Sequence, residues 1–587
     1  MKRRRTAGLA AVSAVAALSL AACGSSGSSS SGGAKSAPVA YNEANTQVVN
    51  PSTHKGGTLA FGLSNTPDST DPGNTYYDFM WNTVRLYGMS LTTYKSCAGL
   101  CGNTVVPMLA TSLGVVGDHG LTWTYHLQPN VKFEDGTTVT SQDVKYAVER
   151  TYARSVLPNG PSYFQVLLGD PAYPGPYTNR KKNEFGLTSV TTPSPTTIVF
   201  HLQHPFADFD YVVAIPQSVP VPPAKDTGAN YQLHPVSTGP YMFQSYTLNK
   251  QFTLVKNPYW NPATDAQVKQ NVDKIVFNLN VNANDIDNRL LAGDLDVDQG
   301  GTGVQTAARA RILSTPSLKQ NSDDALSGFL WFAYINTKVA PLNNVACRRA
   351  IEFAADKQTL QTAYGGPIVG GDIASTVDPP NITGYQKFDL YKALSQPSGD
   401  VADAKAQLKL CGHPNGFSTG LAYRTDRPKE VLAAQALQQS LSQVGIKVQL
   451  NGYLSGKYFT NFAGSTAFVH SHSLGIDMGG WGADWPDGYG FLDEISNGNA
   501  IVTTGGNTNI AELNDPVINS EFAKAANLLV PAQRNAIWGQ IDHQIMSDAG
   551  ILPAVYGKSL LYRSPNLTNV YVDSYYGMYN YAVLGLK

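Results

Sequence analysis

Hydrophobic and polar residues alternate along several short stretches of the chain, which is the pattern of β-strands with one buried face. Residues 121–127 and 197–202 alternate with period two and predict half-buried antiparallel strands. Residues 58–62 and 447–450 predict two further strands. The first of these is followed by a loop at 66–72 and then by a predicted helix that carries Trp81.

Apolar positions with helical spacing appear mainly in the last 250 residues, and helices are predicted at 344–364, 401–411, 428–444 and 531–549. An earlier helix begins after Thr140, where Thr140 and Asp143 form a capping pair in front of an apolar face. Strands and helices are therefore interspersed, and no internal repeat is visible. The pattern predicts an α/β protein.

The N-terminus reads as an export signal. Four cationic residues at 2–5 precede an apolar run at 7–22, and the sequence Leu-Ala-Ala-Cys closes it at Cys23. This pattern predicts cleavage after residue 22 and a diacylglycerol group on the Cys23 thiol. The run is shorter than the roughly 20 apolar residues of a membrane-spanning helix. The alternative is an ordinary secreted protein in which Cys23 is incidental.

Gly and Ser fill residues 24–33, and we expect residues 23–49 to form a flexible tether to a globular body. That body is long enough for two or three domains. Charged residues make up 14% of the chain and the net charge is -1, so it offers no basic field for nucleic acid. The 31 tyrosines would suit an exported protein that binds a neutral or zwitterionic solute.

Four cysteines remain after Cys23, an even number in a compartment where disulfides persist. Cys97 and Cys101 enclose three residues, so a local bridge is easy, and Cys347 would then pair with Cys411. The alternative is a metal site at Cys97 and Cys101, although no histidine lies near them in sequence.

Signatures of secreted hydrolases are missing from the sequence: it contains neither a GxSxG elbow nor an HExxH motif, and residues 452–458 do not fit a phosphate-binding loop. His470 and His472 alternate along a predicted strand, and two histidines without further ligands more often decorate one face of a sheet than bind a metal. We therefore predict no enzymatic activity, no cofactor and no metal site.

Several segments carry a resemblance to a known family. They lie at 107–112, 121–137, 139–146, 237–241, 256–260, 291–296, 335–336, 348–351 with Asp356, 403–405, 444–448 and 481–487. In this order they resemble the extracellular solute-binding proteins of family 5, the peptide, oligopeptide and nickel receptors of ABC importers. The resemblance covers almost the whole chain after the tether.

The resemblance implies a periplasmic-binding-protein-like fold of type II, with two hinged lobes and an additional inserted domain. We expect the first lobe at 50–90, 232–325 and 551–587, the inserted domain at 91–231, and the second lobe at 326–550. A ligand would bind between the lobes.

The motif at 481–487 holds the strongest binding candidate. In peptide-binding members of the family, an aspartate in the matching motif receives the α-ammonium group of the peptide, and here that residue is Asp484. Trp481 and Trp485 would supply apolar walls, and the resemblance places Gly239 near the cleft. The alternative is that Asp484 caps a turn and both tryptophans are core residues.

A peptide's carboxylate needs a cation, and Arg424 and Arg427 follow a predicted strand where a loop can face the cleft. Alternatively, Asp426 marks a helix start and both arginines lie in solvent. Tyr76 and Tyr77 are candidates for the cleft wall or ordinary surface tyrosines.

We therefore predict a monomeric receptor, lipid-anchored on the outer face of the cell membrane. It would capture oligopeptides or dipeptides and deliver them to the permease and ATPase subunits of an ABC importer. Alternatives are an oligosaccharide receptor or a nickel or metal-chelate receptor of the same fold, and, in another class, a peptide-sensing surface receptor without transport or a secreted hydrolase.

Overall fold

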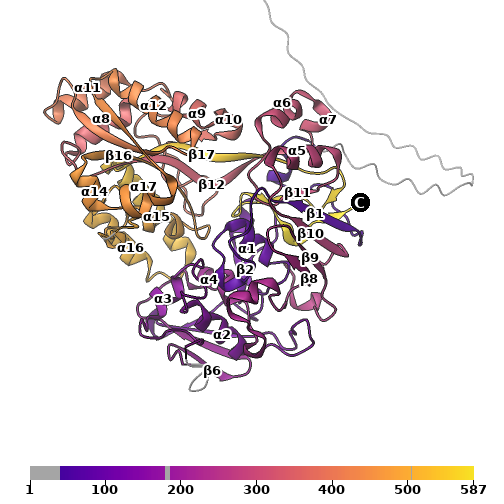
Figure 1. Ribbon diagram of the computed structural model, residues 1–587. Helices are drawn as coiled ribbons and strands as arrows, with labels where there is room; N and C mark the ends of the chain where they lie inside the picture. Colours follow the sequence, from indigo (N-terminus) through magenta and orange to yellow (C-terminus); the bar gives the residue numbers. More distant parts are fainter. Residues whose placement is uncertain (1–39, 179–185, 504) are drawn as a thin grey trace, which may run out of the picture. The chain divides into compact units, whose positions relative to one another are not determined.

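The computed structural model describes residues 40–178, 186–503 and 505–587 (Figure 1). The predicted signal segment, Cys23 and the Gly/Ser stretch at 24–33 lie outside the described residues. Among the helices that the structure does describe, none combines the length and the apolar character needed to span a bilayer.

Three larger sheets organise residues 40–587. The first has five strands in the order β11 (Val297–Asp298), β1 (Thr58–Gly62), β10 (Lys274–Asn278), β9 (Gln251–Lys256) and β8 (Tyr241–Thr247). The second has four strands in the order β4 (Val115–Gly117), β5 (Thr122–His126), β7 (Thr197–His201) and β6 (Val190–Ser194). The predicted strands at 58–62, 121–127 and 197–202 are confirmed as β1, β5 and β7.

The third sheet has six strands in the order β13 (Asp372–Ile373), β17 (Ile551–Tyr562), β12 (Ser322–Ile335), β16 (Leu474–Gly482), β14 (Ser418–Arg424) and β15 (Lys447–Tyr453). The last of these confirms the predicted strand at 447–450. Residues of β12 alternate between two cores: Leu330, Phe332 and Tyr334 belong to one, and Ala333 and Ile335 to the other. Both faces of this sheet are therefore buried.

Helices cover both faces of the six-stranded sheet (Figure 1). One face packs against α8 (Val345–Ala354), α9 (Lys357–Tyr364), α11 (Val401–Leu410) and α12 (Pro428–Ser442). The other packs against α14 (Thr466–Ser471), α15 (Gly488–Ser496), α16 (Pro516–Ala525) and α17 (Pro531–Asp548). The predicted helix at 344–364 is divided into α8 and α9, because Ala355 is extended and the side chain of Asp356 caps α9 by accepting from Thr359 N–H at 2.9 Å.

The remaining helices lie outside the two layers that cover the six-stranded sheet. Near the five-stranded sheet lie α1 (Asp78–Val84), α5 (Ala283–Ala292), α6 (Thr306–Ser314) and α7 (Pro316–Lys319). With the four-stranded sheet lie α2 (Ser141–Thr151), whose predicted capping box is present, α3 (Tyr163–Leu168) and α4 (Phe209–Val212). Short pieces complete the chain: α10 (Gly366–Val369), α13 (Ser455–Lys457), and the strand pairs β2 (Thr92–Tyr94) with β3 (Val105–Pro107), β18 (Leu567–Thr568) with β21 (Gly585–Leu586), and β19 (Val572–Asp573) with β20 (Met578–Tyr579).

Strand β17 corrects one expected boundary. The sequence assigns 551–587 to the first lobe, but β17 pairs with β12 from Tyr334↔Ile551 to Ser322↔Tyr562 and also with β13. It is therefore part of the six-stranded sheet. A lobe boundary at residue 551 would separate β17 from β12, although the two strands satisfy each other's backbone hydrogen bonds along their length.

The predicted flexible tether is wrong at its C-terminal end. Ala44 is fully buried, and its N–H donates to Asp323 Oδ1 at 3.0 Å. Val49 exchanges backbone hydrogen bonds with Val570 at 2.7 and 3.0 Å. Residues 43–49 are therefore fixed against the globular body, since they bury an apolar side chain and satisfy backbone groups there.

Candidate functional site

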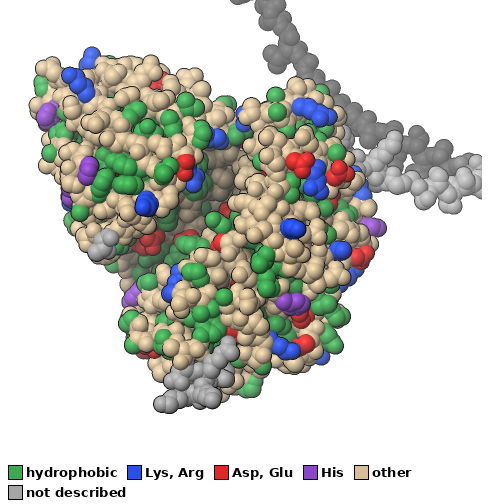
Figure 2. Space-filling view, viewed as in Figure 1, with side chains coloured by type: hydrophobic (Ala, Val, Ile, Leu, Met, Phe, Trp, Pro, Cys, Tyr) green, Lys and Arg blue, Asp and Glu red, His purple; other side chains and the backbone are tan. Residues whose placement is uncertain are grey.

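A cavity of about 730 Å³ brings together residues from distant parts of the chain. Its wall includes the segment from Tyr76 to Trp81, residues 159–162 with Tyr163 at the start of α3, the middle of β12 at Phe329, and the C-terminal end of β16. Figure 2 shows the molecular face that contains the hollow between these elements. The volume lies within the usual range of about 300–1,000 Å³ for ligand sites.

Asp484 lies in this wall, directly after β16, and accepts hydrogen bonds from two tyrosines. Tyr76 OH donates to its Oδ2 at 2.9 Å, and Tyr163 OH donates to the same oxygen. None of the described residues donates a hydrogen bond to Asp484 Oδ1. The carboxylate is therefore fixed in position by one oxygen while the other remains available to a ligand donor.

Burial raises the pKa of Asp484 from 3.8 to about 6, although the hydroxyls of Tyr163 and Tyr76 lower it. The nearby carboxylate of Glu494 raises it further. A cation bound at Asp484 would remove much of this cost, because it favours the charged form of the carboxylate. The site can therefore attract a cation.

Two more carboxylates face the same cavity. Asp78 keeps contact with the solvent inside the cavity, but the surrounding walls raise its pKa to about 6 through desolvation. Glu494 accepts from Thr508 OH at 3.1 Å. Arg154 is the one basic residue in the described lining, and its guanidinium already donates to the carbonyls of Gly160 and Pro158 at 2.6 and 2.7 Å. The cavity is therefore acidic.

Trp481 forms an apolar part of the wall, as predicted from the sequence. On β16 it lies opposite Leu330 of β12, and its buried indole N–H has no hydrogen-bond partner in the described part of the chain. Neighbouring Gly480 makes room for the aromatic wall, since a Cβ there would lie 2.4 Å from the Phe329 ring. Trp481 thus presents an aromatic surface to the cavity.

Trp485 does not line the cavity. Its side chain is 1% exposed, and its indole N–H donates to Asp208 Oδ2 at 3.0 Å. The ring packs edge-on against Tyr163 with centroids 5.1 Å apart. Trp485 is therefore a core residue that supports one of the two tyrosines bonded to Asp484.

Asp487 also lies in the core rather than in the wall. It caps α15 by accepting from Tyr489 N–H at 3.0 Å. Desolvation and the nearby Asp208 carboxylate raise its pKa well above the usual range, whereas Asp208 forms an ion pair with Arg534. Burial beside the Asp208 carboxylate therefore favours the protonated form of Asp487.

The two predicted tyrosines lie at the cavity with exposed rings. Tyr76 stacks on Trp81 with centroids 5.7 Å apart, and Tyr77 stacks on Phe79 at 5.3 Å. Gly239 is elsewhere: it is buried, and its N–H donates to Tyr87 O at 3.0 Å. A Cβ on Gly239 would lie 2.7 Å from the Tyr87 backbone, so the glycine serves a close backbone approach and is absent from the described cavity lining.

The two predicted arginines lie in different environments, one buried and one exposed. Arg424 is buried and forms an ion pair with Glu430 at 2.5 Å. Arg427 is exposed and lines a second cavity of about 490 Å³ at the start of α12. Neither residue reaches Asp484's cavity, and Arg424 is occupied by its own partner.

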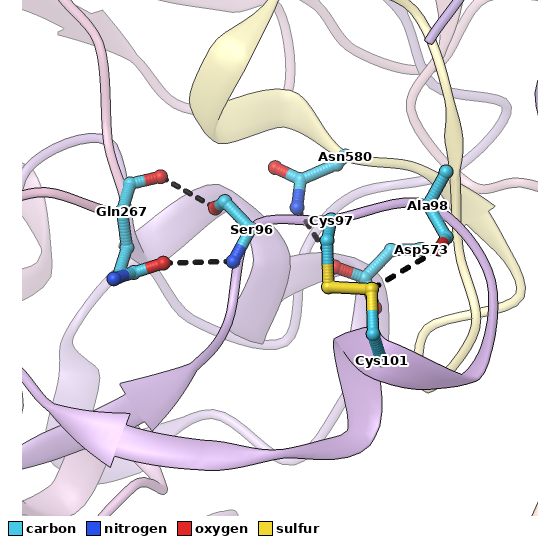
Figure 3. Close-up of a disulfide and its surroundings, with 7 residues drawn as sticks. All are labelled: Ser96, Cys97, Ala98, Cys101, Gln267, Asp573 and Asn580. Carbon is cyan, nitrogen blue, oxygen red and sulfur yellow. Dashed lines mark hydrogen bonds between the residues drawn. A yellow bond between two sulfur atoms is a disulfide. The ribbon is translucent and has the colours of Figure 1, made fainter. Parts of the chain in front are cut away.

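The cysteines pair as the sequence favours. Cys97 is bonded to Cys101, and Cys347 on α8 is bonded to Cys411 at the end of α11. Figure 3 shows the first bridge beside Ser96, whose N–H donates to Gln267 Oε1 at 2.8 Å, and near Asp573. None of the four cysteines belongs to the described cavity lining.

The predicted strand around His470 and His472 is wrong. Residues Thr466–Ser471 form α14, in which Phe468 packs into the core and stacks on His472, four residues later, at 3.8 Å. His470 Nε2 lies 2.7 Å from Glu512 Oε1. Within the described residues no cluster of three or more potential metal ligands occurs.

Sequence reasoning missed Tyr163 and Glu494. Tyr163 reaches Asp484 across 321 positions of sequence, so no local pattern connects them. Glu494 lies ten positions after Asp484 on α15, and only the folding of that helix toward the cavity reveals it.

Comparisons with known proteins agree on one family. The model of "Bacterial extracellular solute-binding proteins, family 5 Middle" matches residues 104–501. The chain is 25% identical over 492 residues to glutathione-binding protein GsiB of Escherichia coli O6:K15:H31 (strain 536 / UPEC), covering 82% of this chain and 86% of that protein. It is 26% identical over 451 residues to the probable D,D-dipeptide-binding periplasmic protein DdpA of Escherichia coli (strain K12), covering 74% and 76%.

Solved structures give the same result. The chain is similar to clavulanic acid biosynthesis oligopeptide binding protein 2, with a TM-score of 0.89, 38% identity and coverage of 94% of this chain and 99% of that one. It shares the fold of DppA from Helicobacter pylori in complex with peptide STSA, with a TM-score of 0.63, 22% identity and coverage of 90% and 98%. These likenesses confirm the predicted type II fold.

Proposed function

The chain belongs to family 5 of the bacterial extracellular solute-binding proteins, and from this premise we propose that it captures oligopeptides or dipeptides with a free amino terminus at Asp484. The observation that carries the proposal is the geometry of that carboxylate. Two tyrosine hydroxyls hold one oxygen, and the other oxygen is available at the wall of an acidic cavity. An α-ammonium group provides the three donors and the positive charge that such a site requires.

The ligands named for the relatives support a peptide. Glutathione, D,D-dipeptides and oligopeptides appear in the names of proteins to which this chain is similar over most of its length. Trp481 would contact the ligand with its ring.

Family 5 proteins serve ABC importers, so the partners that we propose are permease subunits with their ATPases. Binding would shift a hinge equilibrium between two lobes by the ligand's extra affinity for the closed form. We assign 50–90, 232–325 and the chain after β17 to one lobe, 91–231 to the inserted domain, and 326–562 to the other lobe. A lipid on Cys23 would hold the monomeric receptor at the outer face of the membrane.

Native mass spectrometry tests the ligand class. Protein purified without denaturation should carry a set of masses that match short peptides, which are lost after unfolding and refolding. A carbohydrate or a metal chelate as the retained molecule would contradict the peptide proposal and leave the family assignment unaffected.

A further inference from the structure

The Cys97–Cys101 disulfide lies in the loop that connects β2 with β3. Cys101 is exposed and the neighbouring Leu100 is 60% exposed, so a reagent in the solvent can reach this bridge. The other described bridge is enclosed, because Cys347 is 0% and Cys411 9% exposed. The two disulfides therefore differ in their accessibility to a reductant.

The ring that the exposed bridge closes is short. Its cysteines are 4 positions apart in sequence, whereas those of the enclosed bridge are 64 positions apart. A disulfide stabilises a fold mainly by restricting the unfolded chain, and this effect grows with the length of the closed loop. The Cys97–Cys101 bridge therefore contributes less to global stability than the enclosed one, and its main effect is on the conformation of its own loop.

The loop closed by this bridge contacts the C-terminal part of the chain. Gly99 pairs with Asp573 in an isolated β-bridge. Figure 3 shows the disulfide beside Asp573, whose carboxylate accepts from Asn580 Nδ2 at 2.8 Å. The same carboxylate is 1% exposed and forms an ion pair with Arg85 at 3.4 Å. The loop is therefore held against a buried and extensively hydrogen-bonded segment.

That segment also reaches the ligand cavity. Two positions after Asp573, Tyr575 lines the cavity, and its OH donates to Asp484 O at 2.7 Å. Tyr94, the last residue of β2 before the loop, packs on Tyr575 with ring centroids 4.6 Å apart. The β2–β3 loop therefore supports the part of the wall that contacts Asp484.

A third segment joins the loop at Asn103, two positions after Cys101. The side-chain amide of Asn103 donates to Asn381 O at 2.7 Å, and that of Asn381 donates to Ser574 O at 2.9 Å. Asn103 is 4% exposed, so the first of these bonds is shielded from water. Asn381 falls in the range that we assign to the second lobe, and Asn103 in the inserted domain. A loosened loop would therefore disturb a contact between these two parts of the chain.

We propose that the Cys97–Cys101 disulfide is a redox-sensitive support of the ligand cavity, and that its reduction by a dithiol weakens peptide binding. A thiolate of the dithiol attacks the exposed sulfur of Cys101, the S–S bond breaks, and Cys97 leaves as a thiolate. The second thiol of the dithiol then releases Cys101. The dithiol is oxidised to its own disulfide, and its two electrons and two protons pass to the cysteines. The effect on peptide affinity rests on the proposed function, whereas the loosening of the loop does not.

Limited reduction with dithiothreitol tests this proposal. Folded protein is treated until alkylation of a sample shows two free thiols, at Cys97 and Cys101, and peptide affinity is then measured by calorimetry in matched buffers. We expect binding about threefold to tenfold weaker than in the oxidised protein, as for the loss of one hydrogen bond. The double variant Cys97→Ser/Cys101→Ser should bind like the reduced protein, and dithiothreitol should not change its affinity.

A second variant tests the contact without altering the cysteines. Asn103→Ala keeps the bridge but removes the donor to Asn381. It should weaken binding in the oxidised protein, and reduction should then have a smaller additional effect, because both changes act on the same contact. Asn284→Ala, at an exposed position of α5, is the matched control and should respond to dithiothreitol as the wild-type protein does.

Hydrogen exchange adds a measurement that needs no ligand. Reduction should speed amide exchange at 571–576 and around Asn381, because these segments lose contacts with the loop. Equal peptide affinity of the oxidised and reduced forms would overturn the proposal, as would a bridge that resists dithiothreitol until the protein unfolds. If the wild-type protein binds no peptide, the proposed function fails. Exchange rates then decide the loosening of the loop, which unchanged rates would overturn.

Discussion

At the scale of single residues, the site depends on how Asp484 is held. Its carboxylate accepts hydrogen bonds from Tyr76 and Tyr163, which lie in different segments of the chain, and Trp485 packs against Tyr163. A freely rotating carboxylate would bind an ammonium group less tightly, because a fixed acceptor loses less conformational entropy on binding. The motif at 481–487 therefore supplies the carboxylate of Asp484 and also Trp485, which packs against Tyr163 beside it.

Binding should weaken as the pH falls through about 6. Burial raises the pKa of Asp484 to about 6, so below that pH the carboxylate is protonated and cannot attract an ammonium group. Asp78, whose pKa is also raised to about 6, loses its charge in the same range. Peptide affinity measured between pH 4.5 and 8 should fall on the acidic side, whereas an affinity that is constant over this range would contradict the role of these carboxylates.

Replacing Tyr163 with phenylalanine should shift that pH dependence upward. The Tyr163 hydroxyl is the largest influence that lowers the pKa of Asp484, so its removal leaves the carboxylate harder to ionise. We expect roughly threefold to tenfold weaker binding at pH 7 and a midpoint at higher pH, as for the loss of one ordinary hydrogen bond. A variant with weaker binding but an unchanged midpoint would show that Tyr163 acts only through packing.

At the scale of elements, two neighbouring strands form the wall of the cavity. Strand β16 pairs antiparallel with β12, which places Gly480 opposite Trp331 and Gly482 opposite Phe329. These glycines leave space for two large rings on one face of the sheet. The cavity thus depends on the register of this strand pair.

Gly480→Ala should damage this wall. The new Cβ would lie 2.4 Å from the Phe329 ring and 2.9 Å from the Trp331 ring, so both aromatic side chains must move. We expect the free energy of unfolding to fall by about 1–3 kcal/mol, as for other overpacked sites, and peptide affinity to fall with it. Gly456→Ala is the control, because no atom lies within 4 Å of its added Cβ. Equal stability of the two variants by thermal unfolding would contradict this account.

Local sequence patterns identified much of the fold. Strands with strict alternation and helices with clear caps were predictable because their signals are local, whereas Asp484 was inferred from the family resemblance of the motif at 481–487. Its partner Tyr163 is 321 positions away, and the ion pair of Arg424 with Glu430 forms only when α12 folds back on β14. Helix α14 escaped prediction because short helices are decided by packing, here that of Phe468.

At the scale of the whole molecule, a buried network joins parts of the chain that are far apart in sequence. Arg534 of α17 forms an ion pair with Asp208, just before α4, and Asp208 also accepts from Trp485. Both partners of the ion pair are 2% exposed. The segment that carries Asp484 is therefore fixed both to α17 and to the segment before α4.

Arg534→Leu should destabilise the protein strongly. It leaves the carboxylate of Asp208 buried without its cation and beside Asp487, and breaking such a pair typically costs about 3–5 kcal/mol. Chemical denaturation should show this loss, whereas Arg311→Leu, an exposed arginine on α6, should have almost no effect. Similar stability of the two variants would show that the network contributes little.

The most direct test of the central claim is a calorimetric comparison of one tight-binding peptide with its N-acetylated form, on the wild-type protein and on Asp484→Asn. We predict that acetylation weakens binding to the wild-type protein by at least tenfold and that the variant binds both forms equally weakly, because the α-ammonium group and Asp484 form one charge pair. Wild-type protein that binds the acetylated peptide as tightly as the free one would contradict the account.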